Sequence, residues 1–226
     1  MDIDLNADLG EGYGPWRMGE DEAMLALISS ANVGCGFHAG DPLIMDRTAR
    51  LALKHGVDVG AHVGFPDRQG FGRRVMQIDT AELATMVTYQ LGALAGPLLR
   101  AIAAFDPDLI ISSSSSRAIE GAAAECGLRV ASAFLADRAY GDDGLLVPRK
   151  LPGAVIKEEA AVLARVRRLL QDGTILTHSG KSLAMPVRSI LVHGDTPGAV
   201  ALTQTIRREI EASGGRIVPI SRQTAS

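Results

Sequence analysis

Residues 2–11 read Asp2-Ile3-Asp4-Leu5-Asn6-Ala7-Asp8-Leu9-Gly10-Glu11, and this stretch decides the fold class of the chain. Its apolar residues alternate with polar ones, which is the period of a β-strand, and Gly10 then ends the strand. Asn6 and Asp8 share one face of the strand, because side chains repeat every two residues, and Glu11 follows in the glycine turn. The stretch therefore predicts a strand that carries polar groups to its carboxyl end.

Three later segments have the same form, an apolar run followed by glycines and then by histidine or aspartate. They span residues 30–41, 57–67 and 189–195. Stretches with helical spacing separate these runs, and such alternation predicts a parallel sheet with helices outside it. Parallel α/β folds gather their strand ends at one edge, where active sites lie. We therefore expect one polar site built from several loops, in a single domain over residues 1–226, since no linker or charge block divides the chain.

The composition limits the partners of the protein. Its 226 residues, 46% of them hydrophobic and 22% charged, are typical of one globular domain with a proper core. The net charge of −3 and the absence of a basic stripe argue against nucleic acid as a partner. No apolar run approaches the roughly 20 residues of a membrane span, and no signal-like start is visible. We expect a cytoplasmic protein that does not contact membranes.

One place breaks the alternation of strands and helices. The pattern is helical from Asp79 to Phe105, with Gly92 and Gly96-Pro97 inside. Proline in a helix interior costs about 3 kcal/mol or more and normally ends the helix. The pattern thus predicts two helices that meet at Gly96-Pro97, and a strand unit is missing between them.

Several side chains at the strand ends can bind a metal or move protons. Carboxylates and histidines suit both tasks, which singles out Asp8, Glu11, His38 and His62. For Asn6, a role in the turn and a role in the site fit the pattern equally well.

The remaining candidates have structural alternatives. Asp41 before Pro42 is a helix N-cap, and a helix start also attracts anions. Arg74 and Arg138 lie in loops where an arginine can clamp a carboxylate or phosphate, or pair with an aspartate to hold the loop. His193 and Asp195 flank Gly194 at the last such strand end. No Gly-x-x-x-x-Gly-Lys-Ser/Thr motif occurs, which argues against a stand-alone P-loop ATPase.

Long motifs make the chain similar to one known family. The segments 4–12, 30–42, 60–67, 69–74, 136–140, 146–149, 152–156 and 192–199 resemble the LamB/YcsF family, and the resemblance covers nearly the whole chain. It implies an irregular (β/α) TIM-like barrel related to polysaccharide deacetylases. It also implies the A subunit of a bacterial 5-oxoprolinase, which cleaves 5-oxo-L-proline to L-glutamate with ATP hydrolysis, together with B and C partner subunits.

Under this resemblance, Asp8, Glu11, His38 and His62 are the expected catalytic core, with a possible divalent metal at Asp8, His38 and His62. The expected substrate- or phosphate-binding residues are Asn6, Asp41, Arg74, Arg138, His193 and Asp195. ATP is the expected cofactor of the reaction.

The chain departs from the family at Gly96-Pro97, where members carry a strand ending in Lys-Pro-His-Gly-Ala-Leu-Tyr-Asn. Two other interpretations therefore stay open. One is a metal-dependent, deacetylase-like amidohydrolase that acts alone, and the other is a non-catalytic scaffold or binding subunit.

Overall fold

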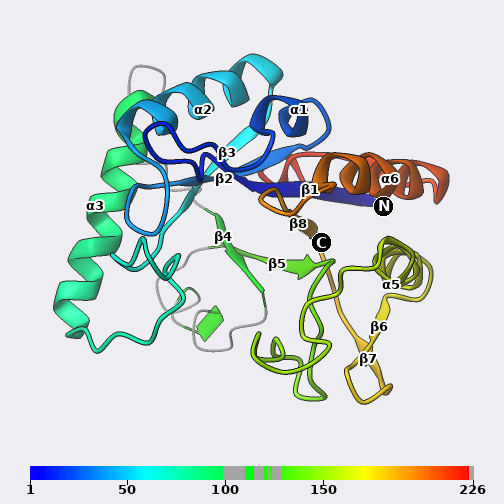
Figure 1. Ribbon diagram of the computed structural model, residues 1–226. Coiled ribbons are helices and arrows are strands. Elements are labelled where there is room, and N and C mark those ends of the chain that lie inside the picture. Colours follow the sequence, from blue (N-terminus) through cyan, green and yellow to red (C-terminus); the bar gives the residue numbers. More distant parts are fainter. Residues whose placement is uncertain (99–109, 115–119, 122, 124–128, 224–226) are drawn as a thin grey trace. The chain divides into compact units, whose positions relative to one another are not determined.

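The computed structural model describes residues 1–98, 110–114, 120, 121, 123 and 129–223 (Figure 1). Its contacts divide the chain into two compact units. Unit 1 comprises Met1–Asn6, Pro107–His193 and Ala201–Ser226, and unit 2 comprises Ala7–Asp106 and Gly194–Val200. The first strand contributes to both. The expectation of a single barrel domain stays a prediction.

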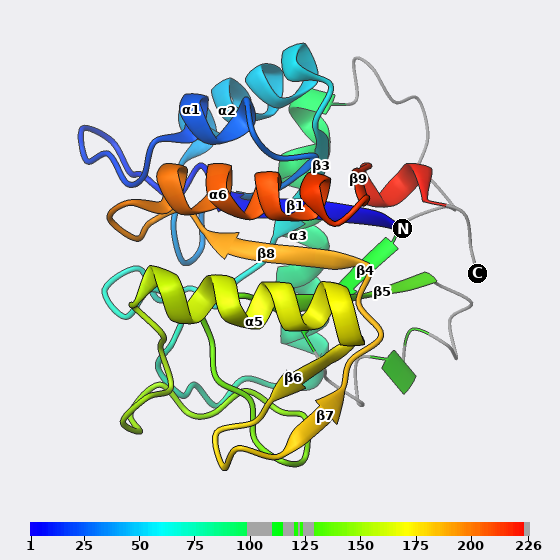
Figure 2. The same ribbon diagram turned by 90° about the vertical axis from the view of Figure 1, so that its right-hand side faces the viewer.

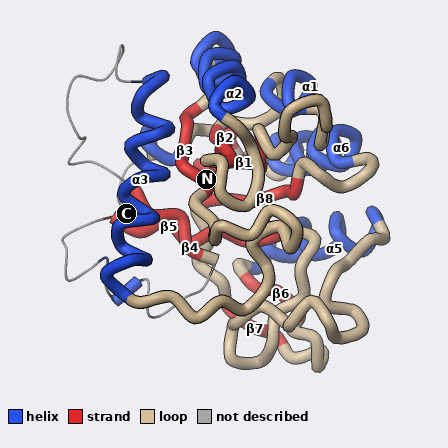
Figure 3. The backbone as a smooth tube through the Cα atoms, turned by 60° about the vertical axis from the view of Figure 1, so that its left-hand side comes forward, coloured by secondary structure: helices blue, strands red, loops and turns tan. Residues whose placement is uncertain are grey.

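Unit 2 is built of strands that alternate with helices along the chain. Strands β2 and β3 pair in parallel, and the register sets Ser30 beside Asp58 and Gly34 beside His62. Their order in the sheet is β3-β2-β1. Helices α2 and α3 contact each other and β3, and Figure 3 shows them beside that strand. The elements are β1 (Asp2–Leu9), α1 (Asp21–Leu25), β2 (Ser30–Gly34), α2 (Pro42–His55), β3 (Asp58–His62) and α3 (Thr80–Leu98).

Helix α2 shows how local sequence fixes these elements. The side chain of Asp41 accepts hydrogen bonds from the backbone N–H groups of Leu43 and Ile44, which confirms the predicted N-cap. Gly56 ends the helix in the left-handed conformation, at φ 69°, which glycine adopts without steric cost. The buried residues recur at helical spacing on one face: Met45, Thr48, Ala49 and Ala52.

Unit 1 also holds a parallel sheet. Strand β5 pairs in parallel with β4 and β8, and β9 pairs in parallel with the start of β1. Helices α5 and α6 lie on the same side of β5 and β8 (Figure 2). The elements are β4 (Ile110–Ser113), β5 (Arg129–Leu135), α5 (Glu159–Asp172), β6 (Thr174–Leu176), β7 (Ser182–Ala184), β8 (Ser189–His193), α6 (Ala199–Ala212), β9 (Arg216–Ile217) and the 3₁₀ turn η1 (Ile220–Arg222).

The structure differs from the sequence prediction in two places outside the Gly96-Pro97 region. The antiparallel hairpin β6–β7 was missed, because its strands have only three residues each. Residues 20–28 have helical spacing, but helix α1 covers only Asp21–Leu25. Strand β1 is buried on both faces, so its polar side chains are inside the protein.

The region of the missing unit is described in part. Helix α3 includes Gly96 and Pro97 and is described as far as Leu98, so the break predicted at Gly96-Pro97 is wrong. The rest of the predicted helical stretch, up to Phe105, lies outside the described residues, as does most of residues 117–126, where the sequence pattern predicts a further helix. Among the described helices, none is both long and apolar enough to cross a membrane.

Candidate functional site

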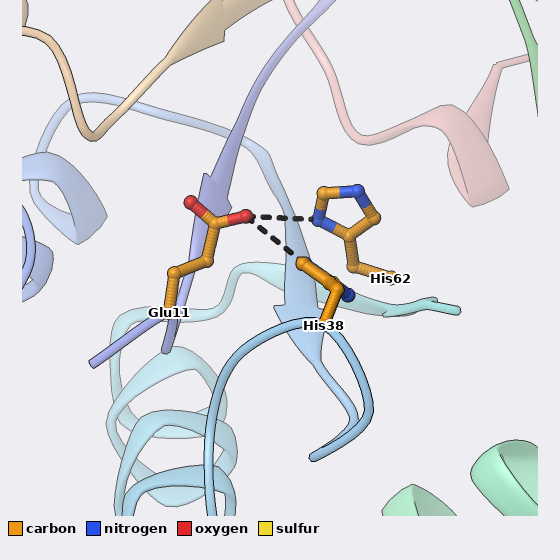
Figure 4. A group of neighbouring side chains, drawn as sticks. All are labelled: Glu11, His38 and His62. Atoms are coloured by element: carbon orange, nitrogen blue, oxygen red, sulfur yellow. Dashed lines mark hydrogen bonds and ion pairs between the residues drawn. The ribbon is translucent and has the colours of Figure 1, made fainter. Parts of the chain in front are cut away.

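Three side chains converge where β1, β2 and β3 of unit 2 end (Figure 4). Nε2 of His38 lies 3.3 Å from Oε1 of Glu11. Nδ1 of His62 lies 3.3 Å from the same oxygen. The two imidazole rings are 4.5 Å apart between centroids. Parallel pairing of β2 and β3 creates this meeting, because it brings the carboxyl ends of successive strands to one edge.

The site is strongly polar although it is mostly buried. Burial raises the pKa of the Glu11 carboxyl, but hydrogen bonds and charge from His38 and His62 outweigh burial and lower it to about 2. Burial lowers the pKa of His62, but the charge of Asp8 and the hydrogen bond with Glu11 outweigh it, so the pKa is raised overall. Glu11 is therefore a carboxylate throughout the physiological pH range.

Asp8 approaches the same nitrogen of His62 as Glu11 does. Its Oδ1 is 3.7 Å from Nδ1 of His62 and accepts a hydrogen bond of 3.0 Å from Nδ2 of Asn32. Glu11, His38 and His62, called the triplet below, are the described residues that could hold a metal ion in the structure, whereas the sequence predicts Asp8 with the two histidines. No pattern in the sequence singles out Asn32, which stands in β2 two residues before Gly34.

The donor set of the triplet fits a divalent metal. One carboxylate and two imidazoles are the ligands of many catalytic zinc sites, which keep a further position open. The three donor atoms lie within 4.8 Å of one another. Ligands at about 2.0–2.2 Å from one ion are separated by distances of this order.

The ring of His38 is enclosed by backbone and by one aromatic side chain. A Cβ atom at Gly64 would overlap Nδ1 of His38, and one at Gly72 would lie 2.8 Å from its Cβ. The ring of Phe71 is nearly perpendicular to that of His38, with 5.2 Å between the two ring centroids. The backbone of Phe71 has a φ of 55°, which non-glycine residues rarely adopt. Within the described part of the chain, Nδ1 of His38 has no hydrogen-bond partner.

The loop that supplies Phe71 and Gly72 is held by an ion pair. Asp67 accepts a hydrogen bond of 2.8 Å from Nε of Arg74, a second from its Nη2, and one of 3.0 Å from the N–H of Gly70. These bonds hold the pKa of Asp67 below its usual range, Arg74 being the largest cause. Arg74, predicted to clamp an anion, thus pairs with an aspartate of its own loop.

Asp41 likewise bonds within the protein. Besides capping α2, it accepts a hydrogen bond of 2.8 Å from the N–H of Gly14. The backbone donors at Ile44 and Gly14 lower its pKa. Asp41 therefore joins the start of α2 to the loop that follows Glu11.

Unit 1 holds a second polar cluster around His193. Nδ1 of His193 is 2.8 Å from both carboxylate oxygens of Asp137, and Nε2 is 3.3 Å from the guanidinium of Arg149. The sequence prediction grouped His193 with Asp195, which belongs to unit 2. Asp137 and Arg149 were not selected, although both stand in the motif segments 136–140 and 146–149.

The two remaining predicted site residues are buried in hydrogen-bond networks of unit 1. Arg138 donates to the carbonyl oxygens of Val147, at 2.8 Å, and Ala154, at 3.2 Å. Asn6 donates to Asp4 and to Ser189, which itself donates to Asp4 at 2.6 Å. These contacts hold strands and loops in place.

Two relatives of the chain are named as A subunits of 5-oxoprolinase. The protein from Ralstonia nicotianae is 69% identical, over 99% of this chain and 97% of that protein. The protein from Pseudomonas syringae pv. tomato is 57% identical over the full length of both chains.

Solved structures confirm the predicted α/β fold. The lactam utilization protein of Thermus thermophilus is 34% identical, with a TM-score of 0.87 over 97% of this chain and all of that chain. A family 4 carbohydrate esterase from Streptomyces lividans has a TM-score of 0.52 at 13% identity, over 95% of this chain and 90% of that one. The second similarity shows the fold alone.

The comparisons also bear on the predicted gap. The alignment with the Pseudomonas relative runs over 256 positions, whereas this chain has 226 residues, so that relative has residues without a counterpart here. The model of the LamB/YcsF family matches in two pieces, residues 3–98 and 93–225, which meet around Gly96-Pro97. Since these pieces and the relatives span nearly the whole chain, the protein belongs to the LamB/YcsF family.

Proposed function

We propose that this protein is the A subunit of a 5-oxoprolinase, which works with B and C partner subunits to convert 5-oxo-L-proline to L-glutamate at the expense of ATP. The observation that carries the proposal is the cluster of Glu11, His38 and His62 in a chain whose relatives are named as this subunit. A five-membered lactam is a stable amide, so coupling its opening to ATP hydrolysis is chemically sensible.

Opening the ring requires water to add to the carbonyl carbon and a proton to reach the leaving nitrogen. A divalent cation held by Glu11, His38 and His62 would supply a Lewis acid that polarises a carbonyl oxygen. We assign Asp8 to accepting the proton of the attacking water and returning it to the leaving nitrogen, because its carboxylate lies beside His62 and is oriented by a hydrogen bond from Asn32. These assignments all lie in unit 2.

In unit 1, we assign His193 and Arg149 to an anionic group of the substrate. Asp137 holds the Nδ1 edge of His193, and Nε2 accepts from Arg149, so the histidine positions the guanidinium whose other N–H groups would bind the anion. A guanidinium beside an imidazole suits a carboxylate or phosphate. For Asn6, Asp41, Arg74 and Arg138, the hydrogen bonds support a role in holding strands and loops, and the role of Asp195 stays a prediction.

A second candidate function is a metal-dependent amidohydrolase that acts alone. The donor set of the triplet favours it, because one carboxylate and two histidines also serve hydrolases that need no ATP. The two functions differ in their requirements: the first needs ATP and both partner subunits, and the second needs only the metal.

The test is glutamate formation from 5-oxoproline by the purified chain, with and without ATP and the partner subunits, and with measurement of bound metal. We expect turnover only in the full mixture. The His38→Ala/His62→Ala double variant should lose about 10²–10⁴-fold in rate, the usual contribution of such groups. His55→Ala, at an exposed position of α2, is the matched control and should keep full activity.

Full activity of the double variant would remove the assignment of the site. Turnover by the chain alone, without ATP, would favour the second function. Retained assembly with the partner subunits but no turnover by the wild-type complex would mean a binding subunit without catalysis.

A further inference from the structure

We propose that Gln90, on helix α3, is a positioning residue of this site, which fixes the imidazole of His38 through the backbone of Gly64. The inference rests on the proposed function, since that function assigns catalysis to His38. Gln90 stands 26 residues after Gly64, in a part of the chain where the sequence analysis placed only a helix.

The side-chain amide of Gln90 forms hydrogen bonds with both the N–H and the carbonyl group of Gly64. Its Oε1 accepts a hydrogen bond of 2.8 Å from the N–H of Gly64, and its Nε2 donates one of 3.1 Å to the carbonyl oxygen of the same residue. Nε2 also donates to the carbonyl of Met86, one helical turn earlier, at 3.1 Å. Both amide protons are used, and the side chain is only 1% exposed. An amide in this position is held firmly to its own helix and to the loop.

The backbone of Gly64 in turn packs directly against the ring of His38. A Cβ at this position would overlap Nδ1 and lie 2.7 Å from Cγ of the histidine, so the backbone itself is in close contact with the ring. Metal-binding or catalytic histidines usually have their second nitrogen fixed by a hydrogen bond. Within the described residues Nδ1 of His38 has none, so on this side the backbone of Gly64 holds the ring in place.

The position of the Gly64 backbone therefore sets the direction in which Nε2 of His38 points. That atom lies 3.3 Å from Oε1 of Glu11, and a small rotation of the ring changes this distance. Misplacement by about 1 Å can lower a rate by about 100-fold. Gln90 acts at one remove, since its bonds are with Gly64 and not with the ring.

Two variants at Gln90 separate its hydrogen bonds from its volume. Gln90→Met keeps a similar volume and removes all three bonds, whereas Gln90→Glu keeps the acceptor for the N–H of Gly64 and loses the donors to the two carbonyls. The control is Leu94→Ala, one turn further along α3, which removes packing of a buried side chain and leaves the hydrogen bonds between Gln90 and Gly64 intact. The melting temperature of each chain gives the structural cost.

The measurements are kcat and KM for 5-oxoproline in the complex with the partner subunits, and the ¹H–¹³C spectrum of the histidine rings in the full chain alone. We expect Gln90→Met to lower kcat about 10- to 100-fold with KM unchanged, and to move the His38 ring signal. Gln90→Glu should lie between Gln90→Met and the wild type. Leu94→Ala should lower the melting temperature and leave the His38 signal in place.

Gly64→Ala provides a second route that does not depend on Gln90. It keeps the backbone groups that Gln90 binds but pushes the ring directly, so it should reproduce the loss of kcat and the moved signal. A wild-type His38 signal and wild-type kcat in Gln90→Met would overturn the inference. So would losses of kcat and melting temperature that match those of Leu94→Ala without any change in the signal. The spectrum needs no turnover, so it tests the positioning even if His38 proves dispensable for activity.

Discussion

At the scale of single residues, the negative charge of Glu11 joins two histidines from different strand ends. One oxygen of this carboxylate faces both His38 and His62, and the side chain is only 5% exposed. A buried carboxylate is costly unless it is paired and hydrogen-bonded. The site therefore depends on the protonation state of its own members.

This dependence predicts how stability changes with pH in the metal-free protein. The pKa of Glu11 falls from 4.5 to about 2 on folding, so its stabilising charge is fully present above about pH 4.5 and is lost as pH falls toward 2. The pKa of His62 is raised above 6.5, so its contribution is full below 6.5 and is lost as pH rises through the raised value. The pair stabilises the fold most between these limits.

Urea unfolding of the wild type and of Glu11→Gln, after treatment with a chelator, measures this. The difference in the free energy of unfolding should be largest within the window from 4.5 to 6.5 and should shrink on both sides. Glu82→Gln, at an exposed position of α3, should show no such maximum. A difference for Glu11→Gln that is the same at every pH would contradict the coupling.

At the scale of elements, the cap of α2 ties a helix to the site. Asp41 receives hydrogen bonds from Leu43, Ile44 and Gly14. Its replacement by alanine removes all three, and loss of an N-cap costs about 0.5–2 kcal/mol. We expect Asp41→Ala to lower the free energy of unfolding by about this amount and Asp41→Asn by less, because asparagine keeps an acceptor. Equal losses in both variants, measured by denaturant unfolding, would show that the charge of Asp41 matters more than its hydrogen bonds.

The same helix shows what the sequence can predict. The cap at Asp41 and the first-turn Pro42 are local signals, and the structure has both where they were expected; Gly56, a residue type that commonly ends helices, ends this one. The strand ends that carry Glu11, His38 and His62 follow from periodicity and from the rule that parallel strands align their carboxyl ends.

Contacts between distant residues could not be predicted in this way. Asn32 beside Asp8, Asp137 beside His193 and Gln90 beside Gly64 join positions that no local pattern relates. Arg74 illustrates the same limit, since its glycine-rich context predicts a ligand clamp, whereas its side chain pairs with Asp67. The three-dimensional neighbours decide between such alternatives.

At the scale of the whole molecule, every member of the triplet precedes Gly96-Pro97, where the sequence predicts that a strand unit is missing. Glu11, His38 and His62, with Asp8 and Asn32, all precede it in the chain. Inserting the unmatched residues of the Pseudomonas relative at Gly96-Pro97, where the two matches to the family model meet, should therefore leave the divalent-metal affinity of the triplet unchanged and raise the turnover of the complex. Competition with a chromogenic chelator and the glutamate assay measure the two quantities. A change in metal affinity of more than about tenfold, or 1.4 kcal/mol, would mean that the restored unit contributes to the metal site.

The two glycines that enclose His38 have different freedom to change during evolution. Gly72 has φ 65°, so most side chains there would strain the backbone as well as crowd the ring. Gly64 is not in that region of φ, and the three atoms nearest to a Cβ placed there all belong to His38. A side chain at position 64 would thus act first on the ring of His38, so selection would remove such a substitution wherever a lineage still uses the site.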